Sequence, residues 1–237
     1  MRNAELYIKE LKQLFVDKDY IKVEELHTFY QSFNTNISKS TINWRIRTLV
    51  QTGIMQRIGR GKYKLGLGKI FQPLLTNKIF KVNSTMKQSF PYLKYIIWHT
   101  SDINSFSQHL VNKDICYVEV ERDAVDAVFE VLREKYKYVL RRQYEDDVYF
   151  GESIIIVRVL VSGSPVQMIR NVPTITIEKL LVDLFSDNDF NYLRGNELTH
   201  IYSNAFSMYT INTDKLLRYA SRKEKRTVIT NFINTIN

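Results

Sequence analysis

The stretch from Ile37 to Lys69 constrains this chain more than any other, because it joins two structural patterns to a strong basic charge. It contains eight Lys and Arg residues and no Asp or Glu. Apolar residues at Ile42, Ile46, Leu49 and Val50 recur at the spacing of the buried side of a helix. The first half of the stretch is therefore predicted to be an amphipathic helix.

Ser38 or Ser40 can cap the N-terminus of this helix. A hairpin is predicted directly after the helix. The segments 54–58 and 62–65 alternate between apolar and polar residues and flank the tight turn Gly59-Arg60-Gly61. A helix followed at once by a basic hairpin is the recognition helix and wing of a winged helix-turn-helix. We therefore expect this region to bind DNA.

The charge of the chain supports this placement of a DNA-binding module. Residues 1–70 hold 13 Lys and Arg against 6 Asp and Glu, whereas the other residues hold 21 against 19. Most of the excess positive charge therefore lies in residues 1–70, the region expected to contact DNA phosphates.

Other bulk features indicate a cytoplasmic protein with no membrane partner. The single cysteine, Cys116, excludes an intramolecular disulfide. The first residues lack the apolar core of a signal peptide. The longest apolar run, 154–161, is interrupted by Arg158 and is too short to cross a bilayer.

The length of 237 residues favours two domains and a mixed α/β fold class. Residues 1–68 are predicted to form the winged helix-turn-helix, with further helices at 3–17 and 23–33. Residues 69–92, which include two prolines, are predicted to be a linker or a crossover. Residues 93–237 are predicted to form an α/β domain that ends in helices.

The first expected elements of the second domain alternate between strands and helices. Strands at 93–98, 115–120 and 138–140 are separated by helices at 102–110 and 122–136, an order that favours parallel pairing. A strand at 153–161 is expected to form a hairpin with 166–171. The expected helices of the last third lie at 176–186, 193–206, 213–220 and 223–233.

The search for catalytic chemistry is mostly negative, so we expect no enzymatic activity, no cofactor and no metal. No phosphate-binding glycine loop is present, and the four histidines have no metal-ligand spacing. One alternative is a nuclease, in which Asp102 and Glu119 would hold Mg²⁺. Glu121 occupies the place of the lysine that such a site needs, and alternation would put Glu119 and Glu121 on a solvent-facing side of the strand.

The chain resembles the AbiEi antitoxins of type IV toxin–antitoxin systems. The resemblance rests on the wing at 54–63, on the segment 173–184, which contains Glu-Lys-Leu-Leu-Val-Asp-Leu, and on the order of the domains. It implies a winged helix that binds inverted repeats in the protein's own promoter and represses the operon. It also implies a C-terminal domain that counteracts a cognate nucleotidyltransferase-like toxin, without a stable complex in the usual case.

The resemblance also assigns residues that contact double-stranded DNA. The candidates lie on the recognition helix and on the wing: Ser40, Thr41, Asn43, Trp44, Arg45 and Arg47, with Arg57, Arg60, Lys62 and Lys64. Asn43 and Arg47 can read purine edges in the major groove. The wing residues are suited to phosphate or to the minor groove. Trp44 is ambiguous, because it could touch DNA or pack against the first helix.

A second group of basic residues lies near the C-terminus and is either a second surface for DNA or antitoxicity, or a solvated helix pair. Its members are Lys215, Arg218, Arg222, Lys223, Lys225 and Arg226. A transcriptional regulator whose second domain senses a ligand or a partner is the non-enzymatic alternative to the antitoxin.

Overall fold

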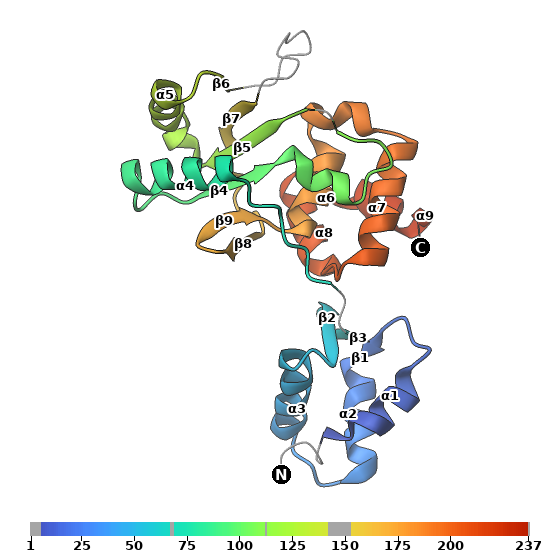
Figure 1. The fold of residues 1–237 in the computed structure, drawn as a ribbon. Coiled ribbons are helices and arrows are strands. Elements are labelled where there is room, and N and C mark those ends of the chain that lie inside the picture. Colours follow the sequence, from blue (N-terminus) through green and yellow to red (C-terminus); the bar gives the residue numbers. More distant parts are fainter. Residues whose placement is uncertain (1–5, 67–68, 112, 142–152, 237) are drawn as a thin grey trace. The chain divides into compact units, whose positions relative to one another are not determined.

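The computed structural model describes residues 6–66, 69–111, 113–141 and 153–236, which fall into two units (Figure 1). The first unit comprises residues 1–70 and 208–215, and the second comprises residues 71–207 and 216–237. Both combine helices with sheets, so the predicted mixed fold class is confirmed. Among the described helices, none is long and apolar enough to cross a membrane.

The first unit has the element order of a winged helix-turn-helix. Its helices are α1 (Ile8–Phe15), α2 (Val23–Phe33) and α3 (Lys39–Gln51). Its strands are β1 (Ile21–Lys22), β2 (Met55–Gly59) and β3 (Lys62–Leu65), which form an antiparallel sheet in the order β1-β3-β2. The predicted start of the first helix at residue 3 lies outside the described residues.

The apolar stripes of the three helices meet in one core. Leu11 of α1, Leu26 of α2, and Ile42 and Leu49 of α3 are fully buried there. The hairpin turn is fixed by Gly61, whose backbone lies in the left-handed region at φ +69° and whose carbonyl accepts a hydrogen bond from the backbone N–H of Val23 at 2.7 Å. These contacts hold the wing against the first residue of α2.

Residues 208–215 complete the first unit from the far end of the sequence. The hydroxyl of Thr213 donates to the carbonyl of Ile58 in β2 at 3.2 Å. The backbone N–H of Thr210 donates to the carbonyl of Lys69 at 3.0 Å. The sequence alone did not indicate this return of the chain.

The second unit is built on a four-stranded sheet in the order β4-β5-β7-β6. The strands are β4 (Tyr95–His99), β5 (Ile115–Val120), β6 (Val139–Leu140) and β7 (Ile154–Val159). The strand β7 pairs in parallel with β5 and β6, but β4 is antiparallel to β5, so the expected parallel pairing of β4 is wrong. A parallel strand needs a long crossover, and the predicted helix at 102–110 is instead the short 3₁₀ turn η2 (Thr100–Ser105).

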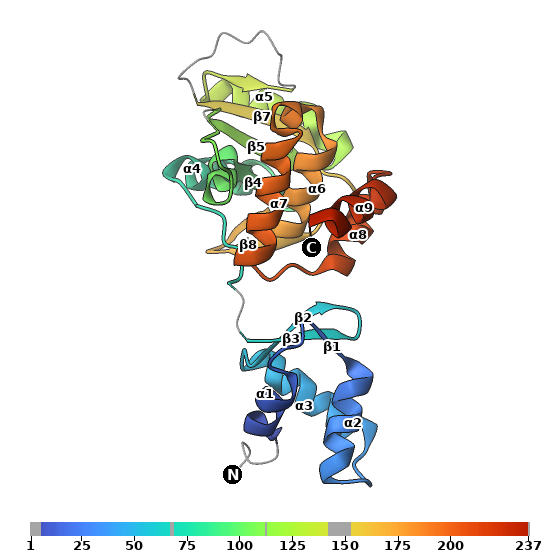
Figure 2. The ribbon, with the colours of Figure 1, turned by 90° about the vertical axis from the view of Figure 1, so that its right-hand side faces the viewer.

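Helices cover both faces of this sheet (Figure 2). On one face, α4 (Asn77–Ser89) and α5 (Val125–Lys135) pack on the apolar side chains of the strands, among them Cys116. The short η3 (Arg122–Ala124) precedes α5. On the other face lie α6 (Ile177–Ser186) and the 3₁₀ segment η4 (Asn188–Leu193), whose Phe190 contacts the rings of Trp98 and Tyr117. Because both faces are covered, polar residues at alternate strand positions are buried too.

Two further expectations for the second unit need correction. Residues 77–89 of the predicted linker form α4, whose buried stripe of Ile79, Val82 and Met86 has helical spacing. The strand β8 (Val166–Ile169) pairs with β9 (Val172–Ile175) and not with β7. Between them, Arg170 and Asn171 have φ values of 46° and 63°, as a tight two-residue hairpin requires.

The last third of the chain is helical, as predicted. After α6 and η4, the helices are α7 (Asn196–Met208), α8 (Thr213–Arg222) and α9 (Arg226–Ile236). The hydroxyl of Thr176 accepts a hydrogen bond from the backbone N–H of Lys179 and caps α6, as the sequence indicated. This cap fixes the start of the helix that supplies two central residues of the site described below.

Candidate nucleic-acid interface and a buried charge network

The outward face of α3 carries exposed hydrogen-bonding side chains. Ser38 caps the helix by accepting the backbone N–H of Thr41 at 3.1 Å. Ser40, Asn43 and Arg47 are exposed, and Thr41 is half-buried. The helix contains no acidic residue. This face therefore offers donors and acceptors of the kind that read base edges.

Trp44 is also on the exposed side of α3. Its side chain is 45% exposed, so it is not a core residue packed under the first helix. The sequence left open whether Trp44 touches DNA or packs against the first helix, and the structure supports the exposed position. An aromatic ring at this place adds apolar surface beside the polar side chains of α3.

Arg45, one of the ten expected DNA contacts, is buried. Its side chain is 8% exposed, and its guanidinium carbon lies 5.8 Å from the ring centre of Tyr7 and 5.1 Å from that of Tyr30. Position 45 lies three residues after Ile42 and four before Leu49, so it shares their inward side. The assignment of Arg45 to the DNA-contacting surface is corrected accordingly: its cation packs on aromatic rings of the core.

The wing presents its four predicted cations to solvent. Arg57, Arg60, Lys62 and Lys64 are all exposed. Within the described ranges, the ion pairs of the structure include neither these four side chains nor Arg47. Lys62 lies over the ring of Tyr20, with Nζ 5.0 Å from its centre. The backbone N–H of Arg60 donates to the carboxylate of Asp214, but the charged groups of these side chains have no carboxylate partner in the described chain and can meet an external anion.

The predicted basic surface near the C-terminus is only partly a surface. Arg218, Arg222, Lys225 and Arg226 are exposed. Lys223 turns inward instead, and its Nζ donates to the carboxylates of Asp183 and Asp187. Lys215 is half-buried and belongs to the first unit, whereas the other five residues belong to the second.

The two carboxylates of the nuclease alternative have different partners. Asp102 accepts backbone N–H groups of Leu74 at 2.7 Å and His99 at 3.4 Å, and burial raises its pKa to about 7. Glu119 is 1% exposed and is held by cations, which corrects its expected solvent-facing position. In the described ranges, no group of three or more His, Cys, Asp or Glu side chains is placed to hold a metal ion.

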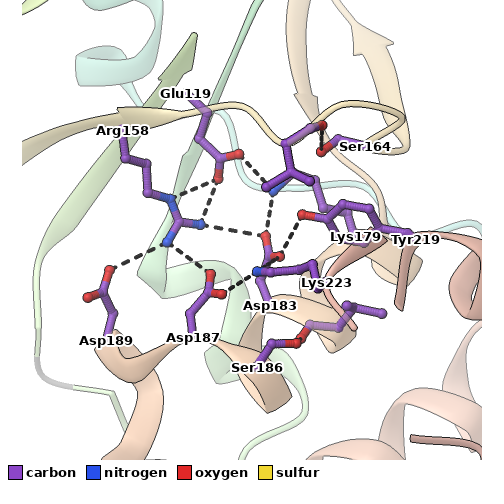
Figure 3. A network of polar contacts seen from close by, with 12 residues as sticks. Glu119, Arg158, Ser164, Lys179, Asp183, Ser186, Asp187, Asp189, Tyr219 and Lys223 are labelled. Carbon is purple, nitrogen blue, oxygen red and sulfur yellow. Dashed lines mark hydrogen bonds and ion pairs between the residues drawn. The ribbon is translucent and has the colours of Figure 1, made fainter. Parts of the chain in front are cut away.

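Glu119 belongs to a network of buried charges on the sheet face that α6 covers (Figure 3). Its partner in the register of β5 and β7 is Arg158, so both side chains project from the same face. Nη2 of Arg158 lies 2.7 Å from Oε1 of Glu119. The same carboxylate oxygen accepts the indole N–H of Trp98 at 2.9 Å. The guanidinium also lies over the ring of Tyr117, at 4.3 Å from its centre.

The helix α6 completes the core of this network with Lys179 and Asp183, which are one helical turn apart. Nζ of Lys179 lies 2.8 Å from Oε2 of Glu119 and 2.5 Å from Oδ2 of Asp183. The other oxygen of Asp183 accepts Nζ of Lys223 and the hydroxyl of Tyr219, both at 2.8 Å. Burial alone would raise the pKa of Asp183, but the adjacent cations hold it well below its usual range.

Two more carboxylates close the network on the side of η4. Nη1 of Arg158 lies 3.1 Å from Oδ2 of Asp187 and 3.4 Å from Oδ2 of Asp189. Asp189 also accepts the hydroxyl of Tyr117 at 3.2 Å. Burial and the charge of Asp183 together raise the pKa of Asp187. The pKa of Asp187 is therefore shifted upward, whereas the adjacent cations lower the pKa values of Glu119 and Asp183.

An open cleft of about 410 Å³ is lined by this network. Its polar lining comprises four acidic and three basic side chains, together with Ser186, Asn188 and Tyr219. Sequence reasoning missed this site, although two signals pointed to it. Arg158 interrupts the longest apolar run, and Lys179 and Asp183 stand inside a mostly apolar helix. Buried charges in apolar segments need partners, and the partners here come from distant segments.

This chain belongs to DUF6577, a family of unknown function whose family model matches residues 41–237. The matched range begins in α3 and includes the wing and every residue of the buried network. Comparison with the curated proteins gives no match, and neither does comparison with the solved structures.

Proposed function

We propose that this protein is a DNA-binding transcriptional regulator whose winged helix binds double-stranded DNA. The observation that carries the proposal is the combination of exposed donors on α3 with four exposed wing cations whose charged groups have no carboxylate partner in the described chain. A helix of this width fits the major groove, and cations of the wing can neutralise phosphates beside it.

The residues divide into two roles in this proposal. Arg47 and Asn43 read base edges, because a guanidinium can pair with guanine and a side-chain amide with adenine. Ser40 and Thr41 lie at the helix N-terminus, where backbone N–H groups and hydroxyls bind phosphate. Arg57, Arg60, Lys62 and Lys64 supply the contacts of the wing to phosphate or to the minor groove.

The resemblance to the AbiEi antitoxins makes the proposal more specific. In that form, the protein acts in the cytoplasm, represses its own promoter at inverted repeats, and counteracts a nucleotidyltransferase-like toxin through its second unit. Inverted repeats call for two protomers, either as a dimer or as monomers that bind cooperatively.

Fluorescence anisotropy with the DNA upstream of the protein's own gene tests the DNA-binding proposal. We expect the full chain to prefer this fragment to a shuffled sequence, and Arg47→Ala to remove most of that preference. Lys87→Ala, which removes an exposed lysine of α4 in the second unit, is the matched control and should leave the preference intact. Equal binding of both fragments by the unaltered protein would refute sequence-specific regulation.

A growth assay tests the antitoxin role separately. The neighbouring gene is expressed alone, with the full protein, and with an Arg47→Ala/Lys62→Ala variant that cannot repress. Rescue by both forms of the protein supports antitoxicity that is independent of DNA binding. If the neighbouring gene does not arrest growth, the antitoxin role is lost and the DNA-binding role is unaffected.

A regulator that senses a ligand is the second candidate, and the open cleft over the buried network favours it. Its volume of about 410 Å³ lies in the range of small-molecule sites. This candidate predicts that a small molecule changes the affinity for promoter DNA, and that Asp189→Asn, at the more exposed side of the network, weakens that response. A promoter affinity that no tested metabolite alters would count against it.

A further inference from the structure

Two adjoining clefts of the second unit share no lining residue with either site described so far. They are formed where α4, the end of α5 and β6 come together. The first has a volume of about 360 Å³ and the second about 570 Å³. Lys81 and Tyr136 line both of them, so the two clefts form one continuous surface. We call this surface the lysine–tyrosine cleft.

The described lining of the lysine–tyrosine cleft is strongly basic. It includes four lysines and, among the described residues, no Asp or Glu: Lys78, Lys81, Lys135 and Lys137. Such an excess contrasts with the network cleft, where four carboxylates balance three cations. A concave surface lined by charge of one sign concentrates ligands of the opposite sign. The described lining therefore favours an anionic ligand.

One of the lysines is held in place by the protein. Nζ of Lys78 lies 2.5 Å from the hydroxyl of Ser153 and 3.3 Å from the carbonyl of Ile154. An ammonium group has three donors, so these two acceptors leave one donor for a ligand. Lys81 follows three residues later on the same side of α4 and is exposed. The helix thus presents one cation held by hydrogen bonds and one exposed cation side by side.

Aromatic rings alternate with the lysines along this surface. Tyr136 and Tyr138 line the clefts on either side of Lys137, and Phe80 lies beside Lys81. All three rings are half-buried, so each is anchored in the protein and keeps an accessible part. Aromatic rings interleaved with cations form the usual binding surface for bases and phosphates of unpaired nucleotides. An acidic peptide would use the lysines but would not need the rings.

From this juxtaposition we propose that the lysine–tyrosine cleft binds the phosphate of a nucleotide, with the base against the aromatic side chains. The nucleotide is either free or part of a single strand, since both sources carry the same chemistry. This site is separate from the duplex contacts assigned to α3 and the wing, and it does not depend on them.

The test measures binding to the full chain in an Arg57→Ala/Lys62→Ala background, which weakens the contribution of the wing. The probes are fluorescein-labelled single strands of DNA and RNA about 15 nucleotides long, and a fluorescent adenosine diphosphate. We expect Lys81→Glu to weaken binding at least tenfold. For a single strand, it should also reduce the dependence of log affinity on log salt by about 0.7, the value for one lost phosphate contact.

Lys87→Glu is the matched control, because it makes the same charge change at an exposed position of α4 that does not line the cleft. It should change affinity less than twofold. Binding of the diphosphate identifies the free nucleotide as the ligand, and binding of the strands alone identifies nucleic acid; both outcomes support the proposal. Equal effects of Lys81→Glu and Lys87→Glu, no binding of any probe, or equally effective competition by polyglutamate would each overturn it.

Discussion

The two units use charge in opposite ways. In the winged helix, Arg47 and the four wing cations are exposed, and their charged groups pair with no carboxylate in the described chain. In the second unit, Arg158, Lys179 and Lys223 are largely withdrawn from water, and each contacts at least two carboxylates. The first arrangement leaves its cations available to an external anion. The second satisfies them inside the protein.

This difference shows why a count of charges does not locate function. The last two thirds of the chain contain more Lys and Arg than the winged helix, 21 against 13, but they also contain 19 Asp and Glu. Exposed cations cost little to keep in water, whereas each buried ion costs several kcal/mol to desolvate unless partners compensate. Stability should therefore respond to the buried charges, and DNA affinity to the exposed ones.

Removal of Asp183 should have the largest effect on stability. Asp183→Ala leaves Lys179 and Lys223 buried beside each other without their shared carboxylate, which should lower the free energy of unfolding by about 3–5 kcal/mol. The control is Asp126→Ala, which breaks an exposed pair with Arg141 and should cost at most about 1 kcal/mol. Urea denaturation measures both. Similar losses for the two variants would remove the contrast between buried and exposed charge.

Asp102 should show the effect of burial without a cation. Its pKa in the folded protein is about 7, above the ordinary value of 3.8. Between these pH values the unfolded chain has released the proton that the folded protein keeps. The free energy of unfolding therefore falls as pH rises from about 4 to about 7, by about 1.4 kcal/mol for each pH unit. Asp102→Asn removes this titration, and denaturation of both proteins across that window measures the difference.

Asp183 should behave in the opposite way. The adjacent cations lower its pKa, so its contribution to stability is present above the pKa of Asp183 in the unfolded chain and is lost as pH falls below about 4.

For Asp102, a stability difference between the natural protein and Asp102→Asn that stays constant from pH 4 to pH 7 would contradict the assignment.

The two arginines of α3 provide the same comparison within one helix. Arg47→Ala should weaken specific DNA binding by about 1–3 kcal/mol and change stability by less than about 0.5 kcal/mol. Arg45→Ala should lower stability by about 1–2 kcal/mol, because its cation packs on the rings of Tyr7 and Tyr30. Anisotropy and thermal denaturation separate the two effects. A loss of DNA binding in Arg45→Ala at unchanged stability would return Arg45 to the interface.

The smallest effect is expected at the wing. Lys64→Ala should weaken binding to specific and to shuffled DNA by the same factor, since a phosphate contact carries no sequence information. The slope of log affinity against log salt should fall by about 0.9. Titrations at several salt concentrations measure this slope. A loss confined to the specific fragment would place Lys64 at a base edge instead.

Much of the fold could be predicted where the signals are local. The buried stripe of α3, its serine cap and the glycine turn of the wing all lie within 33 residues, and the structure has each of them as expected. The pairing of β4 and of β8 could not be predicted in this way. Strand partners depend on segments far apart in sequence, and the propensity of a single strand does not specify its neighbour.

The site was predicted only in part, for a related reason. Exposed residues such as Arg47 follow directly from helical periodicity, but the same periodicity places Arg45 on the buried side. Glu119 was expected to face solvent, because alternation along a strand separates two faces without saying what covers them. The helix α6 covers that face, and its position depends on packing over the whole second unit.

The long sequence span of the buried network has a consequence for synthesis on the ribosome. Glu119 and Lys223 are 104 residues apart, so Glu119 emerges well before the last cation of its network exists. At about 5–20 residues per second, this interval lasts about 5–20 seconds. The winged-helix core formed by α1, α2 and α3 can assemble during that time from residues already made. The charges of the second unit must stay hydrated until α8 and the residue after it are complete, so the final step of its folding includes their dehydration.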